Sequence, residues 1–303
     1  MHAWTNGMST NKQHPTAAVT VRWLGVAGVE IAWDGRSLLI DPYFSRLPLR
    51  RLLVGRPQPD QARIATAWQR LSAEPVAIAV THTHADHALD ISALAQRTPA
   101  PIFGNASLDA LLARAGLTAR VTVCRPGEVH DLPLFGRLAV FAGSHGRFLL
   151  GHPPLPGHID VEGSYPLAAR EYRVGVVLVF DVTVNRRRFV HVGSAGVPVG
   201  ATPEGTCDAL FLCVPGWQAA EDYPAVFLRS LRPRMIVPIH MDRMTRPLDD
   251  PYAARPGGLA ARWLDLPGFL KRLERLAPDI PVRLPVLGRP LDLLHATRTE
   301  TRT

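Results

Sequence analysis

Four side chains of the kinds that bind metals fall within six residues of this chain, in the stretch AVTHTHADHALD. The apolar run VAIAV at 76–80, just before them, has the length and composition of a buried strand. His82 and His84 lie two residues apart, so both imidazoles can point the same way from the end of that strand. Asp86 and His87 follow at the turn into the next helix, where they can reach a second point, as paired-metal sites require. The sequence therefore predicts a metal site at the end of a buried strand.

The ligand types narrow the choice of metal. Imidazole and carboxylate suit Zn²⁺, and they also suit manganese and iron. We expect zinc as the cofactor, one ion or two, with manganese or iron as alternatives. The competing interpretation, ordinary surface histidines at a strand end, does not explain three histidines and one aspartate at this spacing.

The rest of the chain alternates short strands with helices. The runs VTVRWL, VEIAW and SLLIDP, separated by tight turns, predict an antiparallel opening sheet. Asp60 is the expected N-cap of a helix over 61–74, and Ser107 that of a helix that ends before Gly116. Later apolar runs indicate strands near 121–123, 138–142, 174–180, 189–192, 209–214 and 235–239, and helices near 223–231 and 266–277. Two sheets flanked by helices would account for this pattern.

The domain organisation follows from what the chain lacks. No linker rich in Gly or Ser and no repeat of fixed period divides the 303 residues. We predict a single domain over 19–294, between flexible tails at 1–18 and 295–303. The segment 144–170 is rich in Gly and Pro, and we expect it to form a long loop that builds one wall of the active site.

Composition excludes several classes of protein. The chain is 47% hydrophobic and 20% charged, which is typical of soluble globular proteins, and no apolar run reaches the length of a membrane span. The first eighteen residues lack the apolar stretch of a secretory signal, so we expect a cytoplasmic location. Three cysteines without a CxxC pair suggest neither a disulfide framework nor a thiolate zinc site. We interpret all three as buried, inert thiols.

The formal charge of +8 would attract an anionic substrate or nucleic acid. Arginine is spread along the chain without a contiguous basic stripe or a recognisable nucleic-acid module, so we do not expect nucleic acid as a partner. The segment LPLRRLLVG at 47–55 mixes apolar and basic residues as interfacial segments do. A membrane surface is therefore an alternative partner to a small-molecule substrate.

The stretch THTHADH resembles the HxHxDH signature of the metallo-β-lactamase superfamily, and the meander ending in LLIDP lies upstream, where that family has it. The resemblance extends from residue 19 to about 285. It implies an α/β (α+β) fold, the four-layer αββα sandwich of the metallo-β-lactamase fold. The opening WLGVAGVEIAWDGRSLLIDP and the late strand MIVPIH are most similar to the lactonase-like branch, which includes N-acylphosphatidylethanolamine-hydrolysing phospholipase D.

The resemblance also implies where the other ligands lie. His145, in AGSHGR, occupies the family's downstream histidine position, and His240, in VPIHMD, would be a ligand of the second metal. The two sets would then be His82, His84 and His145 for the first metal, and Asp86, His87 and His240 for the second. Asp41, in LLIDP, resembles the family's acidic residue that orients a ligand imidazole, and its alternative role is a turn residue before Pro42.

One position departs from the family. The segment HVGSAG has Ser194 where the family normally has an aspartate that bridges the two metals in a GDxG-like context. A hydroxyl is a poorer ligand than a carboxylate, so we expect the second metal to be the more weakly bound. Asp181 and Asp208 are the nearest acidic residues that could compensate.

The expected activity is hydrolysis of an ester, a lactone or a phosphodiester by metal-bound hydroxide. Asp86 would act both as a ligand and as the catalytic orienter or proton acceptor for that hydroxide. The chain has neither a GxSxG serine elbow nor a GxxxxGK phosphate loop. An anionic substrate could be anchored by Arg50, Arg51, Arg147 and Arg243. The alternatives are a catalytically attenuated metal- or ligand-binding protein, marked by Ser194, and a nuclease.

Overall fold

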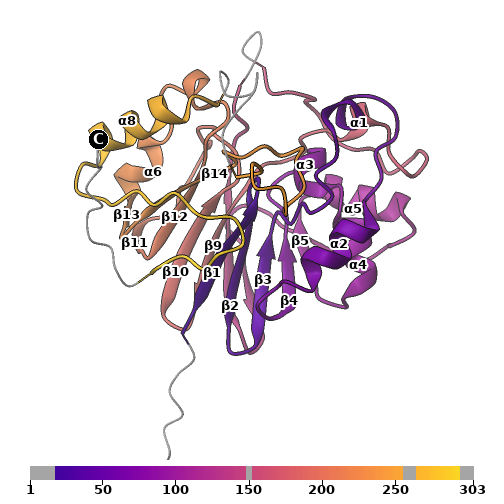
Figure 1. Ribbon diagram of the computed structural model, residues 1–303, viewed down its shortest axis with the longest axis horizontal. Helices are drawn as coiled ribbons and strands as arrows, with labels where there is room; N and C mark the ends of the chain where they lie inside the picture. The colour runs from indigo at the N-terminus through magenta and orange to yellow at the C-terminus, as the bar shows by residue number, and fades with distance from the viewer. Residues whose placement is uncertain (1–17, 148–151, 255–263, 294–303) are drawn as a thin grey trace, which may run out of the picture.

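The computed structural model describes residues 18–147, 152–254 and 264–293. The flexible tails expected at 1–18 and 295–303 lie outside this part of the chain, apart from Ala18. Two six-stranded sheets pack against each other (Figure 1). The first has the order β1 (Thr20–Gly25), β2 (Gly28–Trp33), β3 (Arg36–Ile40), β4 (Glu74–Ala79), β5 (Ile102–Gly104) and β6 (Val121–Val123).

The second sheet has the order β14 (Ile236–Ile239), β12 (Ala209–Cys213), β10 (Arg187–Val192), β9 (Leu178–Val184), β8 (Gly136–Ala142) and β7 (Val129–Leu132). Two short strands, β11 (Gly205–Cys207) and β13 (Leu231–Pro233), form a separate ribbon. The strand expected at 174–180 forms four residues later, as β9.

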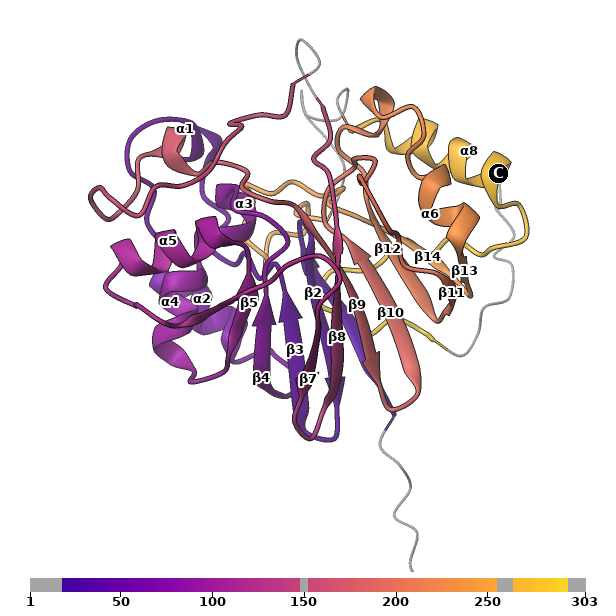
Figure 2. The same ribbon diagram turned by 180° about the vertical axis from the view of Figure 1, so that it is seen from behind.

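Helices cover the outer face of each sheet, as Figures 1 and 2 show. Beside the first sheet lie α1 (Leu49–Leu53), α2 (Gln61–Trp68), α3 (Ala85–Ala88), α4 (Ile91–Arg97) and α5 (Ala106–Arg114). Beside the second sheet lie α6 (Ala225–Ser230) and α8 (Leu266–Leu276). The described residues also form two short 3₁₀ helices, η2 (Ala169–Glu171) and η3 (Trp217–Ala219). The four-layer αββα sandwich expected from the sequence is confirmed. No helix in the described ranges has both the length and the apolar character to cross a membrane.

Strand β3 shows why the first sheet is buried on both faces. Leu38 and Ile40 belong to the hydrophobic cluster between the two sheets. Leu39 points to the other side and belongs to the cluster beneath α2, α4 and α5. Because both faces are covered, the strand is a continuous apolar run. The first three strands pair antiparallel, as their turn spacing predicted.

The starts of two helices depend on polar caps. The Asp60 side chain accepts a hydrogen bond from the backbone N–H of Arg63, so the predicted cap of α2 is confirmed. The predicted cap of α5 is wrong, because Asn105 caps that helix and Ser107 is its second residue. The Ser107 hydroxyl instead accepts a hydrogen bond from the N–H of Ile159. Asn and Ser are comparably good caps, so the sequence pattern could not separate them.

Strand direction brings several loops to one end of the sandwich. Strand β10 runs parallel to β12, and β12 runs parallel to β14. Strand β8 runs antiparallel to β9, which runs antiparallel to β10, so β8 also points the same way. The loops after these strands and after β3 and β4 meet at the end where α3 lies (Figure 1). The six predicted metal ligands, Asp41 and Ser194 all belong to these loops or to α3.

Candidate metal centre

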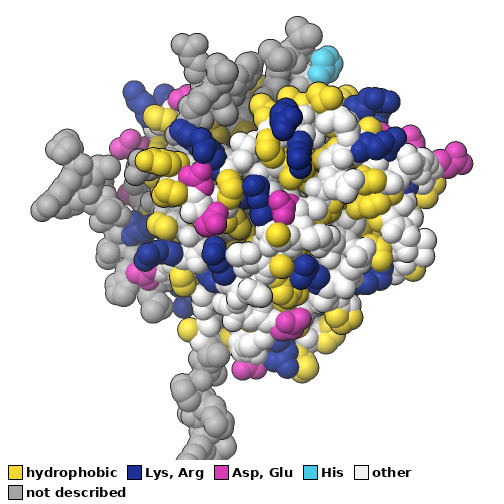
Figure 3. All heavy atoms as spheres, turned by 45° about the vertical axis from the view of Figure 1, so that its right-hand side comes forward, with side chains coloured by type: hydrophobic (Ala, Val, Ile, Leu, Met, Phe, Trp, Pro, Cys, Tyr) yellow, Lys and Arg dark blue, Asp and Glu magenta, His cyan; other side chains and the backbone are white. Residues whose placement is uncertain are grey.

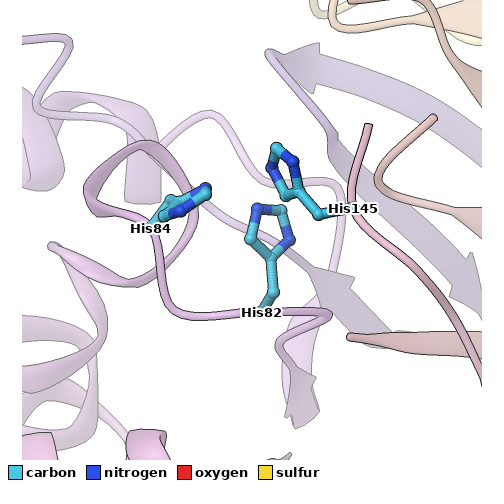
Figure 4. A group of neighbouring side chains, drawn as sticks. All are labelled: His82, His84 and His145. Carbon is cyan, nitrogen blue, oxygen red and sulfur yellow. The ribbon is translucent and has the colours of Figure 1, made fainter. Parts of the chain in front are cut away.

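Three histidines converge from two sheets (Figure 4). His82 and His84 follow β4, and His145 follows β8. Each histidine offers one ring nitrogen, and these three nitrogens lie within 4.8 Å of one another. The centroids of the three rings are 4.6 to 5.0 Å apart. The structure thus brings together the three side chains predicted to hold the first metal.

The second predicted set also comes together. Asp86 and His87 lie in α3, and His240 directly follows β14 with a left-handed backbone φ of 60°. One potential ligand atom of each lies within 4.8 Å of those of the other two. The Nε2 of His240 lies 3.0 Å from the Oδ2 of Asp86. The rings of His82 and His87 are 3.9 Å apart at their centroids, so the two sets adjoin.

Backbone carbonyls set the tautomers of two histidines in the first set. The Nε2–H of His84 donates to the carbonyl of Pro154 at 2.9 Å, and the Nδ1–H of His145 donates to that of Gly146 at 2.7 Å. A carbonyl only accepts, so the lone pair of each neutral ring belongs to its other nitrogen. Metal ligation requires a lone pair of this kind.

Asp41 orients two further imidazoles. Its Oδ2 accepts a hydrogen bond from His87 Nδ1 at 2.9 Å and from the Thr81 hydroxyl at 2.6 Å. Because that hydroxyl donates to Asp41, it accepts from His82 Nδ1, which is 3.1 Å away. The lone pairs of His82 and His87 therefore belong to Nε2. The family resemblance implied this role for Asp41 as one of two alternatives, and the sequence analysis did not single out Thr81, although Thr81 opens the THTHADH motif.

The buried Nε2 of His82 tests whether a metal fits. It has no hydrogen-bond partner among the described residues, although His82 is only 1% exposed. A buried polar atom without a partner is costly, and a metal ion would use its lone pair. The neighbouring donors are imidazole nitrogens and one carboxylate, the set that zinc, manganese or iron accepts.

The backbone at Gly193 lies very close to the Asp41 and Thr81 side chains. A Cβ atom at this position would lie 2.5 Å from Thr81 Oγ1 and 2.8 Å from Asp41 Oδ2. Both distances are too short for real contacts. Only glycine lets the loop after β10 approach the Asp41 and Thr81 side chains.

Burial keeps the first set neutral. It lowers the pKa of His84 to about 4 and that of His145 to about 3. Burial, followed by the neighbouring histidines, also places the pKa of His82 well below its ordinary value. Neutral imidazole is the form that binds metal, so no proton has to leave these rings at pH 7.

The second set contains opposite charges. Burial lowers the pKa of His87, but the carboxylates of Asp41 and Asp86 outweigh this and raise it above its ordinary value. Burial acts to raise the pKa of Asp86, whereas His87 and His240 hold it well below the ordinary range. Asp86 is therefore ionised at neutral pH.

Ser194 lines the same cavity as both sets, and the resemblance implies a bridging aspartate at its position in the sequence. It is buried, and its hydroxyl accepts a hydrogen bond from the N–H of Gly146 at 3.3 Å. Neither acidic residue suggested as a replacement lines the cavity that contains the histidines. Asp181 and Asp208 are instead held by arginines of β10, at 2.6 and 2.7 Å. Neither of these two candidates is therefore placed to supply the carboxylate that Ser194 lacks.

Both sets form the floor of one cavity of about 570 Å³. Its walls are mainly apolar and include Leu49, Leu52, Leu53, Pro154, Leu155, Ala169, Pro215, Met244 and Leu264. Leu155 belongs to the segment 144–170, which was expected to form a wall. Of the arginines named as anchors, Arg243 lines the cavity, whereas Arg50, Arg51 and Arg147 do not.

Cys213 differs from the expectation of an inert core thiol in one respect. It is buried at the end of β12, but it also lines the cavity. Burial raises the pKa of its thiol well above the ordinary value, with a further contribution from Asp86. The thiol is therefore protonated at neutral pH.

Comparison with known proteins finds one family model and several relatives that resemble this chain. The family model described as metallo-beta-lactamase superfamily matches residues 29–168. A UPF0173 metal-dependent hydrolase from Cupriavidus taiwanensis is 27% identical over 231 residues, which covers 73% of this chain and 73% of that protein.

Two solved structures share the fold. Igni18, described as a novel metallo hydrolase from the archaeon Ignicoccus hospitalis, has a TM-score of 0.55 at 16% sequence identity. The match covers 90% of this chain and 97% of the Igni18 chain. CmlA, described as a diiron beta-hydroxylase from Streptomyces venezuelae, has a TM-score of 0.50 at 14% sequence identity. The match covers 92% of this chain and 54% of the CmlA chain.

The matched segment 29–168 includes LLIDP, THTHADH and AGSHGR, which supply Asp41, the clustered ligands and His145. The remaining histidine, His240, reaches the same cavity from β14. The motifs of the matched segment, the fold and the convergence of these residues are those expected from the resemblance to the metallo-β-lactamase superfamily, whose family model matches residues 29–168 of this chain.

Proposed function

We propose that this metal-dependent hydrolase cleaves an ester, a lactone or a phosphodiester with water. One observation carries the proposal: two adjoining sets of metal-ligand side chains form the floor of a cavity large enough for a small substrate. About 300 to 1,000 Å³ is usual for such sites. Zinc is the proposed metal, because five of the six side chains are imidazoles.

Each set has a role in this proposal. His82, His84 and His145 would hold the first metal, and Asp86, His87 and His240 the second. A metal held there would supply Lewis-acid chemistry, which would lower the pKa of a water molecule and polarise the substrate oxygen. Asp86 is ionised and lines the cavity, so its carboxylate can orient water and accept its proton.

The test is metal-dependent hydrolysis. Protein purified without added metal is analysed for its elements, then treated with a chelator and reloaded with zinc. Hydrolysis of p-nitrophenyl butyrate, a γ-lactone and bis(p-nitrophenyl) phosphate is followed at each stage. We expect at least one activity to disappear with the metal and return with zinc. Activity that is indifferent to the chelator would exclude the proposal.

Ser194 favours one alternative, a protein of the same fold that binds metal without turnover. The alternative predicts stoichiometric metal and no hydrolysis in the same experiment. It would also leave the ligand geometry intact, because the ring orientations depend on Asp41, Thr81 and two backbone carbonyls.

Replacing Ser194 with aspartate is expected to strengthen binding of the second metal. The carboxylate would add a charged oxygen to the cavity that both sets line, and we expect the dissociation constant to fall about tenfold or more. Ser194→Asn is the matched control, because it has nearly the same shape without the charge. Zinc titration with a competing chelator measures both variants. Equal affinities for the two variants would rule out a bridging position.

A further inference from the structure

Helix α1 brings three leucines to the cavity that contains the metal ligands. Leu49, Leu52 and Leu53 all line it. Leu52 is buried, whereas Leu49 is 55% and Leu53 66% exposed. Figure 3, which turns the α1 side of the molecule forward, shows hydrophobic side chains beside Lys and Arg side chains in its upper half. The two exposed leucines thus form an apolar edge of the cavity.

The loop that orients His84 extends this apolar surface. Pro154 accepts the hydrogen bond of His84 and also lines the cavity, so this wall adjoins the metal ligands directly. Its neighbour Leu155 lines the cavity and is 40% exposed. A hydrocarbon chain that lies along α1 and Leu155 would therefore start at the ligand cluster and end near the surface.

Two of the charged side chains that line the cavity form ion pairs with other residues of the protein. Asp242 is paired with Arg46 at 2.7 Å, and Arg246 is paired with Asp250 at 3.1 Å. Arg243 adds one cation to a wall that is otherwise mainly apolar. A charged phosphodiester would lose its hydration against these apolar walls, whereas a carboxylic ester or lactone has no charge to desolvate.

We propose that the cavity selects an uncharged carboxylic ester or lactone with an extended hydrocarbon chain, which lies against the leucines of α1 and Leu155. This inference rests on the proposed hydrolase function and names its substrate class. Each buried methylene should raise kcat/KM about fourfold until the chain reaches the surface.

The first experiment compares p-nitrophenyl hexanoate with p-nitrophenyl acetate on the zinc-loaded protein. We expect a hexanoate preference of more than fiftyfold, and Leu53→Asp should reduce it about tenfold by placing a charge beside the chain. Leu134→Asp is the matched control, since Leu134 is 75% exposed in the turn between β7 and β8 and does not line the cavity. It should keep the preference. Equal rates for the two esters, or preferential cleavage of a hexyl phosphodiester, would overturn the inference.

A binding measurement separates this inference from the hydrolase proposal. 2-Octanone carries the same kind of chain beside a carbonyl but has no leaving group, and 2-butanone is its short counterpart. Calorimetric titration of the zinc-loaded protein should show 2-octanone binding at least fiftyfold more tightly, with the difference reduced by Leu53→Asp. This result without any ester hydrolysis would refute the hydrolase and leave the chain-binding cavity. Ester hydrolysis with equal binding of the two ketones would support the hydrolase proposal and refute the chain-binding inference.

Discussion

His145→Ala is expected to abolish binding of the first metal and to lower kcat/KM at least about a thousandfold. His145 comes from the second sheet, whereas its two partner histidines come from the first. Removing it leaves two imidazoles, and even residues that only orient a ligand change affinity ten- to a hundredfold. Loss of the ligand itself should exceed that range, and hydrolysis should be lost with the metal.

Two measurements check this result without relying on a substrate. Elemental analysis after dialysis gives the number of ions per chain. Zinc should also raise the thermal midpoint of the natural protein, because a ligand that binds only the folded state stabilises it. The variant should lose most of this shift. His158→Ala is the control, since His158 is exposed and does not line the cavity. A variant that kept all its zinc would remove His145 from the ligand set.

The clustered part of the site could be predicted from sequence because it is local. His82, His84, Asp86 and His87 span a strand end and one helical turn, so their spacing alone indicates convergence. His145 and His240 are distant in sequence, and only the family resemblance implied their places. Their approach depends on how the second sheet packs on the first.

Other features of the site lacked a sequence signal. The carbonyl of Pro154 orients His84, yet any residue has a carbonyl. Asp181 looked like a candidate ligand because it is acidic and near Ser194 in the chain, but the partner that decides its role is Arg188 on the neighbouring strand. The segment 47–55 was interpreted by composition alone. Only the fold shows that Leu49, Leu52 and Leu53 line the cavity.

The second large effect concerns Arg46, which the sequence did not single out. Its side chain is fully buried, and its Nη2 donates to Asp242 Oδ2 at 2.7 Å and to the carbonyl of Arg243 at 2.6 Å. Its Nε donates to the carbonyl of Arg246. All these partners lie within six residues after His240. Arg46 therefore holds in place the segment that follows His240, a candidate ligand of the second set.

Arg46→Met is expected to reduce the free energy of unfolding by about 3–5 kcal/mol, because it leaves the Asp242 carboxylate buried without its cation. The same variant should weaken zinc binding to the second set, since the backbone beyond His240 loses its anchor. Urea denaturation of the metal-free protein measures the first effect, and zinc titration measures the second.

A double-variant cycle shows whether the ion pair is responsible. Asp242→Asn removes the charge but keeps a side-chain oxygen that can accept the hydrogen bond from the N–H of Val26. If the pair causes the loss, combining Arg46→Met with Asp242→Asn should cost clearly less than the sum of the two single variants. Strict additivity, or a loss below about 1 kcal/mol for Arg46→Met, would mean that the segment after His240 is held by its backbone contacts. Zinc binding to the second set would then be independent of Arg46.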